Sequence, residues 1–182
     1  MGTGAKVAIG CGIAVVVGGV MLAAVVFGGL WWAKGKAEQF TGREAQIEEL
    51  KKKANAVPFT EPADGIVRED RLVKFLDIRR RAFGVYAKHK DELEAMNKKK
   101  QADLSDVTRG LGVLGEVRLA QAQALADVGM SDDEYRFMIH QVYKTLWASA
   151  PADVPPANLA LFRKYEAEIK QYAMGGLEWV GL

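Results

Sequence analysis

The feature of this sequence that most constrains its fold is an uninterrupted apolar segment near the N-terminus. Residues 7 to 33 contain no charged side chain, no asparagine, no glutamine and no proline. About 20 apolar residues in a helix cross the hydrocarbon core of a bilayer, because a helix satisfies its own backbone hydrogen bonds there. Lys6 precedes the segment, and the aromatic and basic residues typical of a membrane interface follow it: Trp31, Trp32, Lys34 and Lys36. We therefore predict a transmembrane helix over residues 7 to 33, after a short tail of residues 1 to 6.

A cleaved signal peptide is the main alternative for this segment. The apolar run is much longer than the roughly 7 to 15 residues of a signal-peptide h-region. Bulky Trp31 and Trp32 also stand at its end, where small residues would precede a cleavage site. The sequence therefore favours an uncleaved, single-pass anchor.

Small residues recur at every fourth position of this predicted helix. Such spacing lets two helix backbones approach closely in lipid, although glycine and alanine are also common in membrane helices generally. We expect this face to pack against other membrane-protein subunits or a second copy of the chain. The residues are Gly10, Ala14 and Gly18, then Gly19 with Ala23, and Ala24 with Gly28.

Residues 34 to 57 are predicted to form a juxtamembrane helical stalk. Their basic run, Lys51 to Lys53, could instead bind anionic lipid. In a continuous helix, however, the run lies about 30 Å beyond the membrane end, well past a Debye length of about 8 Å. The turn-forming residues from Pro58 to Gly65 then predict the start of a soluble helical domain over residues 58 to 182.

The apolar spacing in this domain predicts an all-α fold with a small bundle of about four helices. We expect helices near residues 68 to 98, 104 to 128, 131 to 147 and 156 to 174. Ser105 is a candidate cap of the second helix, and Gly129 closes it. Ser131 and Glu134 predict a capping box at the start of the third.

No constellation of residues predicts a catalytic, metal or cofactor site. The chain has 25 basic and 23 acidic residues, which argues against nucleic-acid binding, and its single cysteine, Cys11, lies in the predicted anchor. Its two histidines, His89 and His140, are far apart in the sequence. Gly110, Gly112 and Gly115 match a dinucleotide-binding pattern but stand inside a helical segment with no preceding strand. We therefore expect a protein that is not an enzyme.

Two features are candidate partner contacts. The first is the run Arg79, Arg80 and Arg81, which could bind a phosphate or an acidic partner surface. The alternative is that Arg79 bonds a carboxylate or a helix C-terminus inside the bundle while its two neighbours face water. The second is the apolar C-terminal tail with Trp179 and Leu182, which must fold back onto the domain or enter a partner.

Three phrases of the soluble domain resemble a family of uncharacterised bacterial proteins with an N-terminal membrane anchor. They are Phe59-x-x-Pro62-Ala63-Asp64-Gly65, Arg71-Leu72-x-x-Phe75-Leu76-x-x-Arg79 and Gly129-Met130-Ser131-x-x-Glu134-Tyr135. The resemblance implies a bacterial source and no particular activity.

Two functional classes follow. The first is an accessory or stabilising subunit of a larger bacterial membrane complex, and the second is a membrane-tethered sensor of a small ligand or lipid. The sensor would need a pocket lined by Phe75, Phe83, Tyr86, Tyr143 and Trp147. We expect the inner membrane, with the domain in the periplasm because very short N-terminal tails commonly stay in the cytoplasm. The basic residues that follow the span favour the opposite orientation.

Overall fold

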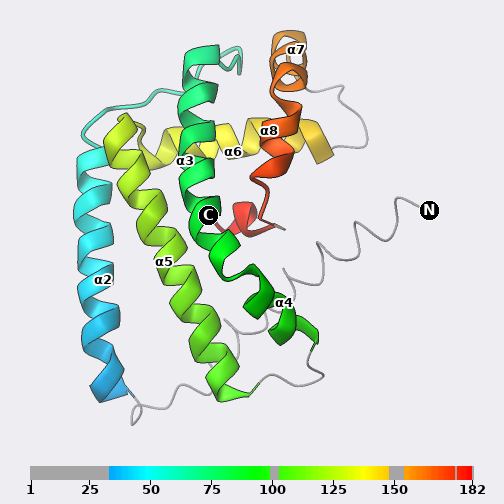
Figure 1. The fold of residues 1–182 in the computed structure, drawn as a ribbon. Coiled ribbons are helices and arrows are strands. Elements are labelled where there is room, and N and C mark those ends of the chain that lie inside the picture. Colours follow the sequence, from blue (N-terminus) through cyan, green and yellow to red (C-terminus); the bar gives the residue numbers. More distant parts are fainter. Residues whose placement is uncertain (1–32, 99–102, 148–153, 175, 182) are drawn as a thin grey trace.

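The computed structural model describes residues 33–98, 103–147, 154–174 and 176–181. All regular secondary structure in these ranges is helical, which confirms the predicted all-α class (Figure 1). The elements are α2 (Ala33–Ala54), α3 (Glu69–Lys88), α4 (Lys90–Lys98), α5 (Leu104–Val128), α6 (Asp132–Trp147), α7 (Pro156–Lys164), α8 (Glu166–Gln171) and a 3-10 helix η1 (Leu177–Val180).

The predicted transmembrane helix, with its small-residue stripe and Trp31 and Trp32, lies outside the described residues except for Ala33, where α2 begins. Among the described helices, none combines the length and the apolar character that a membrane crossing requires. Lys34 and Lys36 belong to the first turns of α2.

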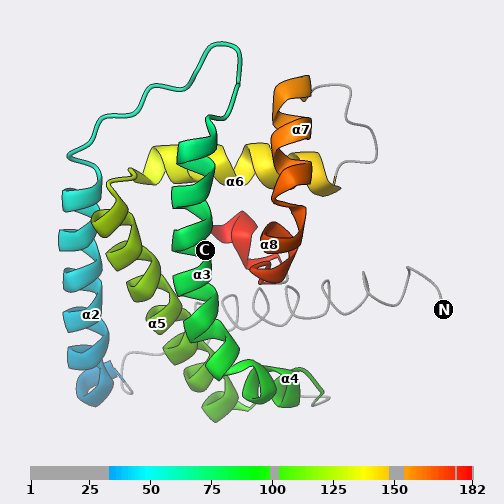
Figure 2. The same ribbon diagram turned by 45° about the horizontal axis from the view of Figure 1, so that its top comes forward.

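Helix α5 lies between α2 and α3 and packs along both (Figures 1 and 2). Helix α6 begins beside the upper ends of α2 and α5 and runs behind the N-terminal half of α3, and α7 and α8 lie on the side of α3 that faces away from α2. The main apolar core joins α3, α5, α6, α7 and α8 through Leu72, Phe75, Ile78, Leu125, Met138, Val142, Phe162 and Ile169. A second apolar cluster joins α3 and α5 to the C-terminal residues Met174 and Leu177.

Helix α2 belongs to this bundle, which differs from the solvated stalk expected over residues 34 to 57. Ile47 and Ala54 are completely buried. Arg43 lies across α5 and donates a hydrogen bond from Nη1 to the carbonyl of Gly112, at 3.1 Å. A Cβ on Gly115 would come within 2.6 Å of that nitrogen, so glycine leaves room for the guanidinium. Among residues 42–54, where the burial of α2 is described, only Ile47 and Ala54 are buried, so the sequence showed no broad apolar face and indicated a stalk.

The linker between α2 and α3 is also part of the folded body rather than its boundary. The ring of Phe59 packs on that of Phe137 in α6, with centroids 5.5 Å apart. The buried Asn158 in α7 accepts a hydrogen bond from the Val67 amide and donates one to the Gly65 carbonyl, at 2.8 and 2.9 Å. The linker therefore has a fixed path over α6 and α7.

Two of the predicted helices are each broken into two. His89 separates α3 from α4, and its amide bonds the carbonyl of Tyr86 in a tightened turn. Tyr165 separates α7 from α8 in the segment expected to be one helix over residues 156 to 174. Neither residue is a glycine or a proline, so the breaks carried no signal in the sequence.

The bounds of α5 and α6 agree with the prediction, and their caps agree in part. Gly129 closes α5 in the left-handed conformation, with φ of 64°. The cap at the start of α5 is not Ser105 but Asp103, which forms a capping box with Asp106. Ser131 Oγ accepts from the Glu134 amide, as expected, but the Glu134 carboxylate turns away to Arg71.

Candidate functional site

An arginine carried by α3 is enclosed at the centre of the domain. The side chain of Arg79 has no exposed surface. Its Nη2 donates to Glu178 Oε1 at 2.7 Å and to the Tyr172 carbonyl at the end of α8 at 2.9 Å. Its Nη1 donates to the Tyr135 hydroxyl at 3.1 Å. One guanidinium therefore ties α3 to α6, α8 and the C-terminal residues.

Glu178 organises the last turn of the chain, residues 176 to 181, which we call the C-terminal turn. Its carboxylate accepts hydrogen bonds from Arg79 and from the amides of Met174 and Gly176. Gly176 and Gly181 have φ values of 100° and 87°, which favour glycine and allow the turn. Leu177 and Glu178 are thus buried against the domain, as expected if the tail folds back onto it.

The charges in this centre stabilise one another. Burial opposes the guanidinium charge, but Tyr135, Tyr143 and Glu178 outweigh that effect, so the pKa of Arg79 is raised. Burial raises the pKa values of the Tyr135 and Tyr143 hydroxyls, against the opposing effect of Arg79. The arginine therefore stays charged and both phenols stay neutral at physiological pH.

Of the three consecutive arginines, Arg79 is buried and Arg80 and Arg81 are exposed, as the alternative interpretation of the sequence predicted. Arg79 bonds a carboxylate and a helix C-terminus in the core, so it lies away from any partner surface. Arg80 and Arg81 face water, where both pair with Asp77 and Arg81 also pairs with Asp127. These two remain available at the surface. The side chains of Trp179 and Leu182 lie outside the described part of the chain.

The aromatic residues proposed to line a ligand pocket pack in the core instead. Phe75 and Tyr143 are enclosed in the main apolar cluster, and Tyr86 is enclosed in the second. Phe83 stacks at an angle against Tyr86 and Tyr172. The side chain of Trp147 is not among those that the structure describes. In the described part of the chain, these aromatic side chains fill the space between helices.

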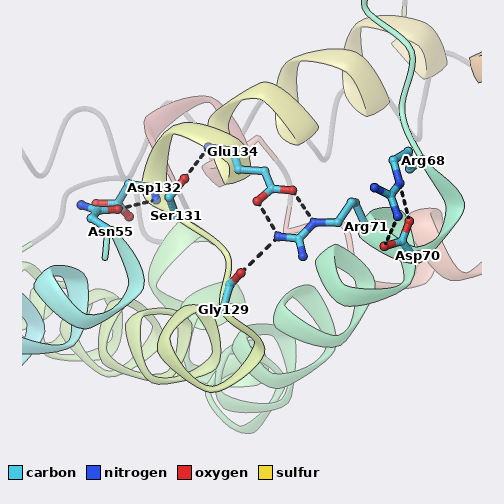
Figure 3. Close-up of polar contacts among 8 residues, drawn as sticks. All are labelled: Asn55, Arg68, Asp70, Arg71, Gly129, Ser131, Asp132 and Glu134. Atoms are coloured by element: carbon cyan, nitrogen blue, oxygen red, sulfur yellow. Dashed lines mark hydrogen bonds and ion pairs between the residues drawn. The ribbon is translucent and has the colours of Figure 1, made fainter. Parts of the chain in front are cut away.

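A polar clamp holds the corner between α5 and α6 (Figure 3). Arg71 in α3 donates to both carboxylate oxygens of Glu134 in α6 and to the carbonyl of Gly129, at 3.2 Å. Asn55, at the end of α2, accepts from the Asp132 amide at 2.8 Å. The clamp thus joins α2, α3, α5 and α6, and both arginine and glutamate occur in the phrases that carry the family resemblance.

Beside the clamp lies a hollow of about 390 Å³, which we call the linker groove. The linker forms one wall and α6 the other. Two of its lining residues, Val57 and Ile66, are exposed, at 44% and 39%. Its remaining lining is Pro58, Phe59, Thr60, Pro62, Val67, Arg68, Arg71, Glu134, Phe137 and Met138. Local sequence patterns did not predict this groove, because its walls come from segments that are separate in the chain.

The residues that the structure describes include no arrangement suited to binding a metal ion or a nucleotide. No group of histidine, cysteine and carboxylate side chains there is placed to hold a metal ion. His89 lies at the surface beside Glu92 and Glu116, at 3.5 and 3.2 Å. Gly110, Gly112 and Gly115 lie within α5 and do not form a phosphate-binding loop.

Comparison of the chain with protein-family models, with curated proteins and with solved structures finds no significant match. The family resemblance noted in the sequence therefore remains an expectation.

Proposed function

We propose that this protein is a non-enzymatic accessory or stabilising subunit of a larger bacterial membrane complex. In this proposal residues 7 to 33 anchor it in the inner membrane, with the folded domain on the periplasmic side. The membrane helix packs against neighbouring helices, and the linker groove receives an apolar side chain of a partner subunit.

The observation that carries the proposal is the concentration of exposed apolar surface at the groove. Among the described residues, Val57, Ile66 and Val73 are the large hydrophobic side chains that are exposed. Two of these three line the same hollow. Scattered apolar residues are normal on a protein surface, whereas apolar residues gathered around a hollow mark an interaction site.

The size and rim of the groove indicate what kind of segment it accepts. A hollow of about 390 Å³ holds one large apolar side chain rather than a whole helix. Arg68 and Asp70 pair at the adjoining surface, at 3.0 Å. A central apolar anchor surrounded by polar contacts is the usual arrangement at a protein interface. We therefore infer a partner segment with a single protruding leucine, phenylalanine or methionine.

The walls of the groove are held in place before a partner binds. The Phe59 and Phe137 rings pack together, Asn158 fixes the linker backbone, and Arg71 holds Glu134. Because little ordering is left to occur on binding, more of the contact energy contributes to affinity. This rigidity favours a stable subunit contact.

The test compares the full chain with acidic substitutions in membranes extracted with mild detergent. Val57→Asp and Ile66→Asp together should release the protein from a heavy fraction while leaving it in the membrane, because an unpaired carboxylate in the groove opposes apolar contact. Val73→Asp is the matched control, since Val73 is 48% exposed but lines a separate hollow. Native mass spectrometry should show co-purifying subunits for wild type and control only. Equal retention of all three proteins would contradict the proposal.

A further inference from the structure

A second hollow, of about 350 Å³, lies between α2, α5, α6 and the C-terminal turn. We call it the three-helix hollow. Its lining is part apolar and part charged, and comprises Ile47, Lys51, Leu114, Arg118, Gln121, Ala122, Leu125, Asp132, Tyr135, Arg136 and Gly181. Its volume is within the lower range of small-molecule sites.

We propose that the three-helix hollow binds a small, water-soluble organic phosphate that carries a hydroxyl group. This proposal is independent of the linker groove, because the two hollows share no lining residue.

The first support is the charge of the lining, where three cations stand against one carboxylate. Lys51, Arg118 and Arg136 come from three different helices. Cations that reach a site from several elements suit a tetrahedral anion, whose oxygens point in several directions. A planar carboxylate would engage fewer of them.

The second support is that these cations are not committed to strong internal pairs. Lys51 and Asp132 form a partly buried ion pair, but its Nζ–Oδ2 distance of 3.5 Å is longer than that of a strong charge-assisted hydrogen bond. Arg118 pairs with Glu44 at 3.2 Å, but both side chains are more than two-fifths exposed, and such surface pairs are weak and exchangeable. Arg136 pairs with no carboxylate in the part of the chain that the structure describes. A phosphate can therefore recruit these side chains at little cost.

The third support is a buried acceptor without a donor. Gln121 lines the hollow and is only 7% exposed. Its Nε2 donates to the Gly181 carbonyl at 2.8 Å, whereas its Oε1 receives no hydrogen bond from the described residues. Buried polar groups are normally satisfied, so this carbonyl calls for a ligand group that donates. A phosphate ester with a hydroxyl supplies both the anion and the donor.

The position of the hollow favours a soluble ligand over a lipid. Ile47 lies about 21 Å along α2 from Ala33, at 1.5 Å per residue. If the anchor ends at Ala33, a headgroup at the membrane surface does not reach the hollow. The ligand then enters from the aqueous side.

The experiment is isothermal titration calorimetry of the full chain in phosphatidylcholine nanodiscs, in a phosphate-free buffer, with glycerol 3-phosphate as the probe. We expect saturable binding by wild type and at least a tenfold loss for Arg118→Gln with Arg136→Gln, since each charge-assisted hydrogen bond is worth about that factor. Arg81→Gln with Arg163→Gln is the matched control, because it removes the same charge elsewhere and should leave affinity unchanged. No binding by wild type, or equal binding by both double variants, would overturn the proposal.

The hydroxyl is tested separately, with sulfate as an anion that has no donor. Wild type should prefer glycerol 3-phosphate to sulfate, and Gln121→Met should lose that preference while still binding sulfate. Equal affinity of wild type for the two anions would contradict the inference that the ligand carries a hydroxyl group.

A lipid source is tested with phosphatidylglycerol nanodiscs in high salt, which should leave the affinity for glycerol 3-phosphate unchanged. Competition specific to this lipid would assign the site to a lipid headgroup instead. Unchanged thermal unfolding midpoints establish that each variant is folded.

Discussion

Arg79 and Glu178 are 99 residues apart in the chain, yet their Nη2 and Oε1 atoms lie 2.7 Å apart and neither side chain reaches solvent. The pair connects α3 to the C-terminal turn, so Glu178 is part of the buried interior of the domain. A buried pair of this kind contributes little net energy relative to apolar packing, but removing one partner leaves a costly buried charge.

We predict that Arg79→Met lowers the free energy of unfolding by about 3 to 5 kcal/mol, because it leaves Glu178 buried without its cation. The measurement is urea unfolding of the full chain in detergent, followed by circular dichroism. Arg80→Met is the control, since Arg80 is exposed and its pair with Asp77 should be worth less than about 1 kcal/mol. The double variant Arg79→Met, Glu178→Leu should recover part of the loss. Similar costs for the variants at 79 and 80 would contradict the structural role of the pair.

Alkaline pH should destabilise the domain through Tyr135. Burial raises the pKa of its hydroxyl above the ordinary value of 10.0, so the unfolded chain releases this proton at a lower pH than the folded chain. The stabilisation is therefore fully present below pH 10 and is lost as the pH rises through the raised folded pKa. We expect the free energy of unfolding to fall more steeply above pH 10 in wild type than in Tyr135→Phe. Parallel curves for the two proteins would show that the hydroxyl does not contribute.

Asn158→Ala should detach the linker from α7. The substitution leaves the Val67 amide and the Gly65 carbonyl without their partner, and each unsatisfied buried group costs about 1 to 3 kcal/mol. We expect a loss of about 2 kcal/mol or more, together with faster proteolysis between residues 55 and 68. Asn55→Ala removes one exposed bond to Asp132 and serves as the control, with a smaller expected loss. Unaltered proteolysis of the Asn158 variant would mean that other contacts fix the linker.

The glycines of α5 provide a test of how α2 packs. Gly110→Ala should stabilise the domain by about 0.5 to 1 kcal/mol, because alanine favours the helix and nothing lies within 4 Å of the added Cβ. Gly115→Ala should gain less, since its Cβ displaces the Arg43 guanidinium and with it the bond to Gly112. Urea unfolding gives both values. Equal stabilisation by the two substitutions would indicate that α2 does not rest on α5 in solution.

Local features of the fold were predictable from the sequence, and features that depend on distant contacts were not. The bounds of α5 and the left-handed Gly129 follow from apolar spacing and from the conformational freedom of glycine, which act over a few residues. The break at His89 follows no such local rule. The packing of α2 on α5 could not be predicted, because it depends on Arg43, a charged residue whose guanidinium lies against Gly115 and donates to the Gly112 carbonyl.

The candidate site shows the same division. Burial of Arg79 was one of two interpretations of the sequence, but its partner Glu178 could not be chosen among the 23 acidic residues. No local sequence pattern identified Gln121 or Val57 as residues of a candidate site. Their importance depends on which segments the fold brings beside them, namely the C-terminal turn for Gln121 and α6 for Val57.

The small-residue stripe of the predicted membrane helix supports the proposed subunit role. Ala14→Leu with Gly18→Leu should leave the protein in the membrane but detach it from its complex, because bulky side chains hold the two helix backbones apart and forfeit close packing. Ile13→Leu with Val17→Leu is the control, since it changes large apolar residues that lie beside the stripe. Co-sedimentation after mild detergent extraction is the measurement, and the urea unfolding of the folded domain should not change. A stripe variant that stays in the heavy fraction, beside a Val57→Asp, Ile66→Asp variant that leaves it, would assign the contact to the linker groove and reduce residues 7 to 33 to a tether.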